Sequence, residues 1–154
     1  MKKILILFFI TFITFINAEE IDIKADHFHA DDLNKVAYFE GNAQIQQGQN
    51  SFSASQVVVY FNKKKKAIKY EAIGSVFFDL IENGIHYRGE AQKILYSPNS
   101  SMYFFSGGVK LEDLTNNRKI SAEVITLDLN TGLADIKGTD TKPVHFRFEI
   151  EDRE

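Results

Sequence analysis

The chain has 154 residues, 44% of them hydrophobic, and a formal net charge of −3 at pH 7. This mild acidity argues against nucleic acid as a partner, because nucleic-acid-binding domains concentrate positive charge on one face. The chain contains no cysteine, which excludes disulfides, thiol catalysis and thiolate metal sites. An apolar core must therefore hold the fold together, and a chain of this length can bury one.

The N-terminal segment has the pattern of a targeting sequence. Two lysines precede an apolar run over Ile4–Ile16, which is followed by Ala18 and then acidic residues. This order is typical of a secretory signal peptide. An uncleaved membrane anchor is the alternative interpretation. The run is shorter than the roughly 20 apolar residues that span a membrane, which favours the signal peptide. We predict a cleaved signal peptide at residues 1–18 and one domain at residues 19–154.

Beyond Ala18, apolar and polar residues alternate, as expected of strands with one buried face. A short first strand is expected around Ile21 and Ile23. The dipeptide Asn83-Gly84 is a strong hairpin signal. No segment has a helical period, so an all-β fold is predicted. The later strands are expected at Val36–Ile45, Phe52–Phe61, Ile68–Glu82, Ile85–Tyr96, Tyr103–Glu112, Lys119–Leu129, Leu133–Lys137 and Val144–Ile150.

Glycines recur at intervals of about 33 residues, which indicates a stack of one repeated supersecondary unit. The four glycines are Gly41, Gly74, Gly107 and Gly138. Each is expected to follow a small residue in a strand context, and these small residues are Ala25, Ala54, Gly89 and Ala122. A glycine inside a strand marks a bend or bulge. One bend per repeat lets two sheets share strands and fold over each other. The predicted fold is an open, folded-over β jelly roll built from repeated antiparallel strand units, with an unpaired edge at each end.

Residues with catalytic or metal-binding potential are few. His27 and His29 would share one strand face, with Asp26, Asp31 and Asp32 as the nearest carboxylates. We interpret this stretch as a solvated polar face. The sequence contains no nucleophile–base arrangement, paired-carboxylate context or phosphate-binding glycine loop. Neither an enzymatic activity nor a cofactor or metal ion is predicted.

The only basic run, Lys63, Lys64, Lys65 and Lys66, falls on a predicted turn. We interpret it as a solvated hairpin tip that keeps the turn soluble. The alternative is an electrostatic contact with an anionic partner such as a phosphorylated lipid head group.

Four stretches share one recurring pattern, namely Ile21–Asp26, Phe39–Gly48, Phe105–Leu111 and Ala122–Gly132. Together they resemble the OstA-like family. The resemblance implies a periplasmic protein that carries lipopolysaccharide between the inner and outer membranes, with the acyl chains in a groove between two sheets. It also implies head-to-tail homo-oligomers and contacts with an LptC-like inner-membrane protein and an LptD-like outer-membrane protein.

The candidate groove-lining residues share the predicted inward phase. They are Ile21, Ile23, Phe39, Ile45, Val57, Val59, Phe78, Tyr96, Val109, Ile125 and Leu127. Phe77 is an alternative to Phe78, because the strand phase there is ambiguous. For assembly, we predict that the last strand, Val144–Ile150, joins the first strand of a second copy.

Two other functions stay open on this evidence. One is a membrane-anchored relative with the same fold and an uncleaved N-terminus. The other is a structural β-repeat protein whose core is fully packed. A carbohydrate-active enzyme would need a facing carboxylate pair, and the sequence shows none.

Overall fold

The computed structural model describes residues 20–150, and every regular element in that range is a strand. The strands are β1 (Ile21–Lys24), β2 (His27–Asp31), β3 (Val36–Gln47), β4 (Asn50–Phe61), β5 (Ala67–Glu82), β6 (Ile85–Ser97), β7 (Met102–Asp113), β8 (Arg118–Asp128), β9 (Leu133–Lys137) and β10 (His145–Phe148). Within these residues there is no helix with the length and apolarity needed to cross a bilayer. The predicted signal peptide lies outside the described residues.

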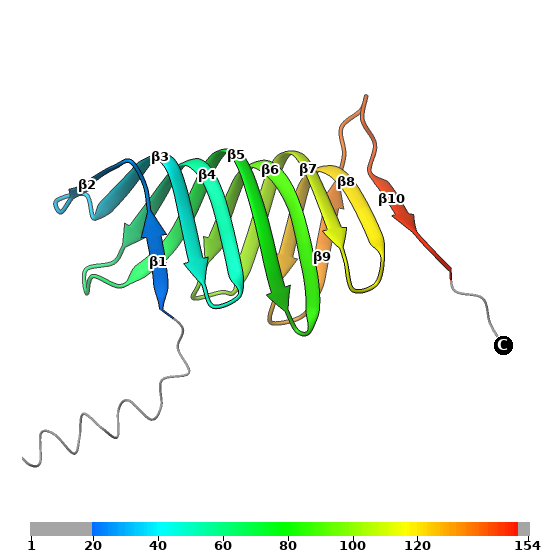
Figure 1. Ribbon diagram of the computed structural model, residues 1–154, viewed down its shortest axis with the longest axis horizontal. Coiled ribbons are helices and arrows are strands. Elements are labelled where there is room, and N and C mark those ends of the chain that lie inside the picture. The colour runs from blue at the N-terminus through cyan, green and yellow to red at the C-terminus, as the bar shows by residue number, and fades with distance from the viewer. Residues whose placement is uncertain (1–19, 151–154) are drawn as a thin grey trace, which may run out of the picture.

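All strands pair antiparallel in one sheet with the order β1-β3-β4-β5-β6-β7-β8-β10 (Figure 1). At the first edge, β1 pairs with residues 44–47 of β3, whereas β2 pairs with residues 36–40 of the same strand. At the last edge, β10 pairs with residues 118–121 of β8 and β9 pairs with residues 124–128. Each long strand from β3 to β8 therefore contributes one half to each of two layers. We call these the β1 layer, which ends in β10, and the β2 layer, which ends in β9.

The two layers meet along a line of β-bulges. Every pairing from β3–β4 to β7–β8 shifts register at one equivalent level. On β3, β5 and β7 the glycine at this level has a φ of 83°, 87° and 85°, and the residue after it also has a positive φ. A side chain at Gly41, Gly74 or Gly107 would meet Asp26, Ser55 or Gln92 within 2.8 Å. Glycine is required there because it alone adopts this conformation freely and leaves room for the neighbouring strand.

These bulges confirm the predicted bends at three of the four repeating glycines, but two markers of the repeat are wrong. Gly138 lies in the coil after β9, so the last repeat is split into two strands and is not one bent strand. The small residue equivalent to Ala54 is Ala91, not Gly89, because Gly107 stands over Gln92. Gly89 and Ala91 are both small and two residues apart, so alternation alone does not separate them.

The strand β2 is absent from the sequence prediction. Its sequence has only Phe28 and Ala30 as an apolar alternation, and it becomes a strand by pairing with β3. Its contribution is to complete the first edge of the β2 layer.

The apolar core lies between the inner faces of the two layers. Its largest fully buried side chains are Phe105, Leu80, Ile125, Val57, Val76 and Val109. Among the described residues, the one buried charged side chain is Asp113 at the β7–β8 hairpin. Its carboxylate accepts hydrogen bonds from the backbone and side chain of Asn116, both at 2.9 Å, and pairs with Arg118. Burial raises the pKa of Asp113, but these bonds outweigh burial and keep the pKa below its ordinary value.

Candidate functional site

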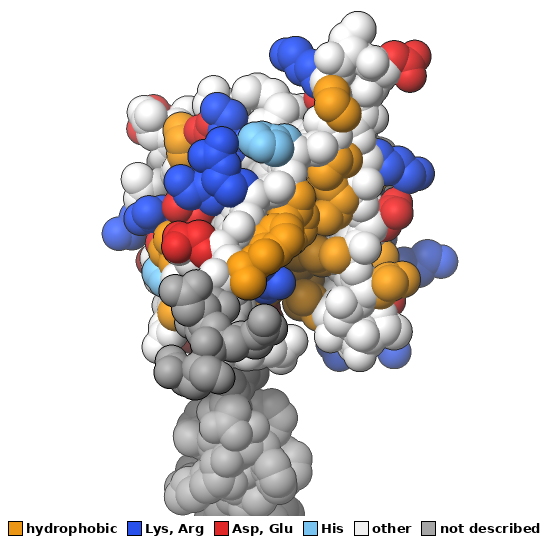
Figure 2. All heavy atoms as spheres, turned by 90° about the vertical axis from the view of Figure 1, so that its right-hand side faces the viewer, with side chains coloured by type: hydrophobic (Ala, Val, Ile, Leu, Met, Phe, Trp, Pro, Cys, Tyr) orange, Lys and Arg blue, Asp and Glu red, His pale blue; other side chains and the backbone are white. Residues whose placement is uncertain are grey.

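The space between the two layers is the candidate site. Rings from opposite layers meet across it: Phe78 of β5 lies 5.0 Å from Phe105 of β7, and Phe52 of β4 lies 6.4 Å from Tyr103 of β7. On the side away from the bulges, no strand pairing links the layers in the described part of the chain. Figure 2 shows this space end on, as a cleft bordered by hydrophobic side chains. The fold is therefore a wedge that is joined along one side and open along the other.

Two small apolar gaps lie along the open side. One, of about 30 Å³, is lined by Ile21, Ile45, Gln47, Phe52, Tyr70, Ala72, Ile94, Tyr96 and Tyr103. The other, of about 90 Å³, lies on the far side of Tyr103. Its lining is mostly apolar, with Leu80, Tyr87, Leu127, Leu129 and Leu133 among the residues, but it also includes Glu82, Asn83 and Asp128. We call the rim of these two gaps the lip. The deeper interior is filled by side chains, so the lip is where another molecule first meets apolar surface.

A row of stacked rings runs along the β2 layer from the lip into the core. Tyr70 lies 6.2 Å from Tyr96, Tyr96 lies 4.5 Å from Tyr103, and Tyr103 lies 5.9 Å from Phe105. Burial raises the pKa of Tyr70, Tyr96 and Tyr103, most strongly for Tyr103. These phenols therefore stay neutral at physiological pH. The row offers an uncharged aromatic wall that suits hydrocarbon rather than an ionic ligand.

All eleven predicted groove residues lie on the inner faces of the layers, at two depths. Six are buried in the core, namely Ile45, Val57, Val59, Phe78, Val109 and Ile125. Ile23, Phe39, Tyr96 and Leu127 are half-buried against that core, and Ile21 is 38% exposed at the lip. Contact of any of them with lipid remains a prediction, and the burial pattern favours the lip residues as the first to be reached.

The structure also decides between the two neighbouring phenylalanines. Phe78 is 3% exposed and points inward, whereas Phe77 is 55% exposed on the outer face. Several lip residues were missing from the sequence prediction, among them Phe52, Tyr70 and Tyr103. The alternation of apolar and polar residues that identified Tyr96 could have identified them too. In the sheet, Tyr70, Tyr96 and Tyr103 are register partners across β5, β6 and β7, so they share one face.

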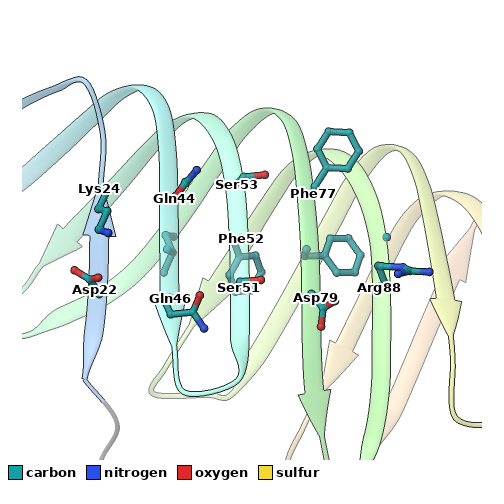
Figure 3. A pocket seen from close by; sticks show the side chains of 13 residues that line it. Asp22, Lys24, Gln44, Gln46, Ser51, Phe52, Ser53, Phe77, Asp79 and Arg88 are labelled. Carbon is teal, nitrogen blue, oxygen red and sulfur yellow. The ribbon is translucent and has the colours of Figure 1, made fainter.

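A larger hollow, of about 510 Å³, lies elsewhere, on the outer face of the β1 layer (Figure 3). Its labelled side chains are mostly polar and carry both signs of charge: Asp22, Lys24, Gln44, Gln46, Ser51, Phe52, Ser53, Phe77, Asp79 and Arg88. A shallow hollow of mixed charge is typical of a solvated outer sheet face. We assign the site to the smaller inner gaps because their lining is mainly apolar and Tyr103 borders both of them.

Comparisons with known proteins identify the family and the fold of the chain. The family model described as LptA/(LptD N-terminal domain) LPS transport protein matches residues 22–133. No curated protein sequence matches the chain. Among solved structures, the chain is similar to LptH from Pseudomonas aeruginosa, described as the LptA homologous periplasmic component of the conserved lipopolysaccharide transport device. That match has a TM-score of 0.73 and 15% identity, and covers 86% of this chain and 96% of LptH. At this identity the likeness is one of fold.

Proposed function

The chain belongs to the family of LptA and LptD N-terminal-domain lipopolysaccharide-transport proteins, and we propose that it is a periplasmic carrier that shields lipopolysaccharide acyl chains on their way from the inner to the outer membrane. The resemblance to the OstA-like family is thereby confirmed, and with it a transport role rather than an enzymatic one. The proposal includes cleavage after Ala18, release into the periplasm, and contacts with LptC-like and LptD-like membrane proteins.

The observation that carries this proposal is the apolar wedge that is open along the lip. Each methylene withdrawn from water contributes about 0.8 kcal/mol, so a lipid with several acyl chains needs continuous shielding between membranes. Since the deep core is packed, the chains would enter at the lip and spread the layers, which are joined along the bulges. The sequence has no phosphate-binding loop for a nucleotide, so directional movement must be driven by another component.

A structural β-repeat protein with a closed core is the second candidate. The observation in its favour is the full burial of residues such as Val57 and Ile125, which leaves only small gaps between the layers. In that case no lipid would enter, and the lip would serve only as the rim of the core.

The two candidates differ in a site-specific cross-linking experiment. A photo-reactive amino acid would replace Tyr96 at the lip or, as a control, Phe77 on the outer face. We expect lipopolysaccharide to be captured at position 96 and not at position 77, and to be found by mass spectrometry in the purified protein. Capture at neither position, or equal capture at both, would favour the closed-core alternative.

We further propose head-to-tail assembly in the direction set by the sheet order. The path from β1 to β10 contains an even number of antiparallel strands, so the two edge strands run in opposite directions. A second copy placed with its β1 beside β10 therefore continues the antiparallel alternation. Such a contact joins two different surfaces and does not close, so it produces open chains.

A further inference from the structure

Three side chains with metal-binding atoms meet on the outer face of the β2 layer, at its first edge. His27 and His29 alternate on one face of β2, and Glu40 of β3 is the register partner of His27. One potential ligand atom from each of the three lies within 4.8 Å of the other two. The edge strand and its neighbour thus bring two imidazoles and one carboxylate together.

The carboxylate of this cluster is not one that the sequence suggested. Asp26 accepts a hydrogen bond from Asn42 Nδ2 at 2.9 Å. Asp31 accepts two from Asn34, at 2.9 and 2.6 Å, and so closes the β2–β3 turn. Glu40 comes from the next strand, and only the pairing of β2 with β3 places it beside the two histidines.

Neighbouring side chains hold the cluster in place. The His29 ring stacks on Tyr38 with centroids 4.7 Å apart, and its Nδ1 lies 3.5 Å from Glu40 Oε1. The other carboxylate oxygen, Oε2, accepts a hydrogen bond from Gln56 Nε2 at 3.4 Å. The Gln56 hydrogen bond is of the kind that orients a ligating carboxylate and raises metal affinity.

We propose that His27, His29 and Glu40 bind a divalent transition-metal ion such as Zn²⁺. Two histidines and a glutamate form a known zinc-ligand set that leaves a fourth position open. Imidazole nitrogens select zinc or copper over magnesium and calcium, which prefer oxygen ligands. The exposed histidine side chains need only rotate to reach bonds of about 2.0–2.1 Å to the metal.

The register of the sheet suggests what fills the fourth position, and this step rests on the proposed head-to-tail assembly. Along the outer face of the β2 layer, His27 pairs with Glu40 at one edge, and Val124 pairs with Lys137 at the other. If β2 of the next copy pairs with β9 in the register that the other strands keep, Lys137 lies opposite His27 of that copy. Asp135 then lies opposite its His29. Asp135 is exposed, and its carboxylate forms an ion pair with Lys137 Nζ at 3.8 Å. Asp135 of one copy can thus complete the metal site of the next and strengthen the junction.

Zinc titration of the full chain by calorimetry tests the site. We expect one zinc per chain for the parent protein and no response to Mg²⁺. Loss of the ligand in His29→Ala should weaken zinc binding by at least the ~10-fold that loss of an outer-shell partner costs. His86→Ala is the matched control, because His86 also faces a carboxylate, that of Asp79 at 2.7 Å, but belongs to no three-residue cluster among the described residues. Absence of saturable zinc binding, or an equal loss in both variants, would overturn the site.

Light scattering with and without zinc tests the junction. We expect zinc to at least double the mean oligomer mass of the parent protein but to leave Asp135→Asn and His29→Ala unchanged. Asp135→Asn should still bind one zinc per chain. A normal response to zinc in Asp135→Asn would overturn the assignment of the fourth ligand. Lipid capture at position 96 is measured independently, so its failure would refute the carrier role and leave the zinc titration standing.

Discussion

The bulge glycines predict a sharp difference between two chemically identical substitutions, Gly107→Ala and Gly132→Ala. Both glycines have a positive φ, 85° and 75° respectively. A Cβ at Gly107 would lie 2.6 Å from the Cβ of Gln92, whereas a Cβ at Gly132 meets nothing within 4 Å. The pair therefore separates the effect of backbone conformation from the effect of strand-to-strand contact.

The expected magnitudes follow from these two terms. A non-glycine residue in the left-handed region costs roughly 1–2 kcal/mol, and the loss of unfolded-state entropy offsets about 0.4–1 kcal/mol of that. Gly132→Ala should thus lower the free energy of unfolding by about 1 kcal/mol. Overpacking against Gln92 adds roughly 1–3 kcal/mol, so Gly107→Ala should lower it by about 2–4 kcal/mol.

Urea unfolding followed by circular dichroism measures both values, and a double-mutant cycle with Gln92→Gly isolates the contact. Removing the Cβ of Gln92 should recover most of the additional loss in Gly107→Ala and none of the loss in Gly132→Ala. Equal destabilisation by the two alanines, or no coupling to Gln92→Gly, would refute the argument that the bulges need glycine for strand approach.

Three further outcomes are expected. Ile21→Asp, which places a charge at the lip, should reduce capture of lipopolysaccharide at position 96, whereas Phe77→Asp on the outer face should not; equal capture in both variants would contradict the lip as the entry route. Phe146→Pro removes a backbone donor and kinks β10, so it should lower the oligomer mass in light scattering while the β signal persists; unchanged mass would exclude β10 as the junction. Because the pKa of Asp113 is held below its ordinary value of 3.8, its stabilising contribution is complete above that pH and is lost as the pH falls through the lowered pKa. Asp113→Asn should therefore unfold with a weaker acid dependence than the parent protein, and an identical pH profile would contradict this.

The fold was largely predictable because its determinants are local. The alternation of apolar and polar residues predicts the strands, and glycines at a nearly constant spacing mark the bulges. Which of Phe77 and Phe78 faces inward was not predictable, since two adjacent phenylalanines satisfy the alternation equally well. The bulge at Gly74 lies just upstream and removes the reference for the phase. Only packing against Phe105 of the opposite layer makes Phe78 the inner residue.

Contacts between strands and between layers account for what the sequence could not predict about the histidine cluster and the groove. The stretch His27–Asp31 has a weak strand signal, and its pairing with β3 is what adds Glu40 to the two histidines. The depth of each inner residue is likewise invisible to alternation. Val57 and Ile21 have the same phase, yet one is 1% exposed and the other lies at the lip. Depth depends on the opposite layer, which the sequence of one strand does not describe.

The inner rows of side chains also favour the head-to-tail joining of copies. In the β1 layer, one row of register partners begins at Ile23 and ends at Phe146. In the β2 layer, the corresponding row begins at Phe28 and ends at Ile136. Phe146 and Phe28 are 43% and 57% exposed, although both lie on inner faces.

In the proposed assembly, Phe146 of one copy lies beside Ile23 of the next, and Ile136 lies beside Phe28. Both exposed rings then gain an apolar neighbour on the inner face, which is favourable because apolar surface leaves water. The same step extends the apolar interior of one copy into that of the next without a polar break. A junction shifted by one residue would set inner residues against the outward-facing His145 or Arg147, because a shift of one residue exchanges the two faces of a strand. Sheet register thus links the strength of the junction to the continuity of the groove.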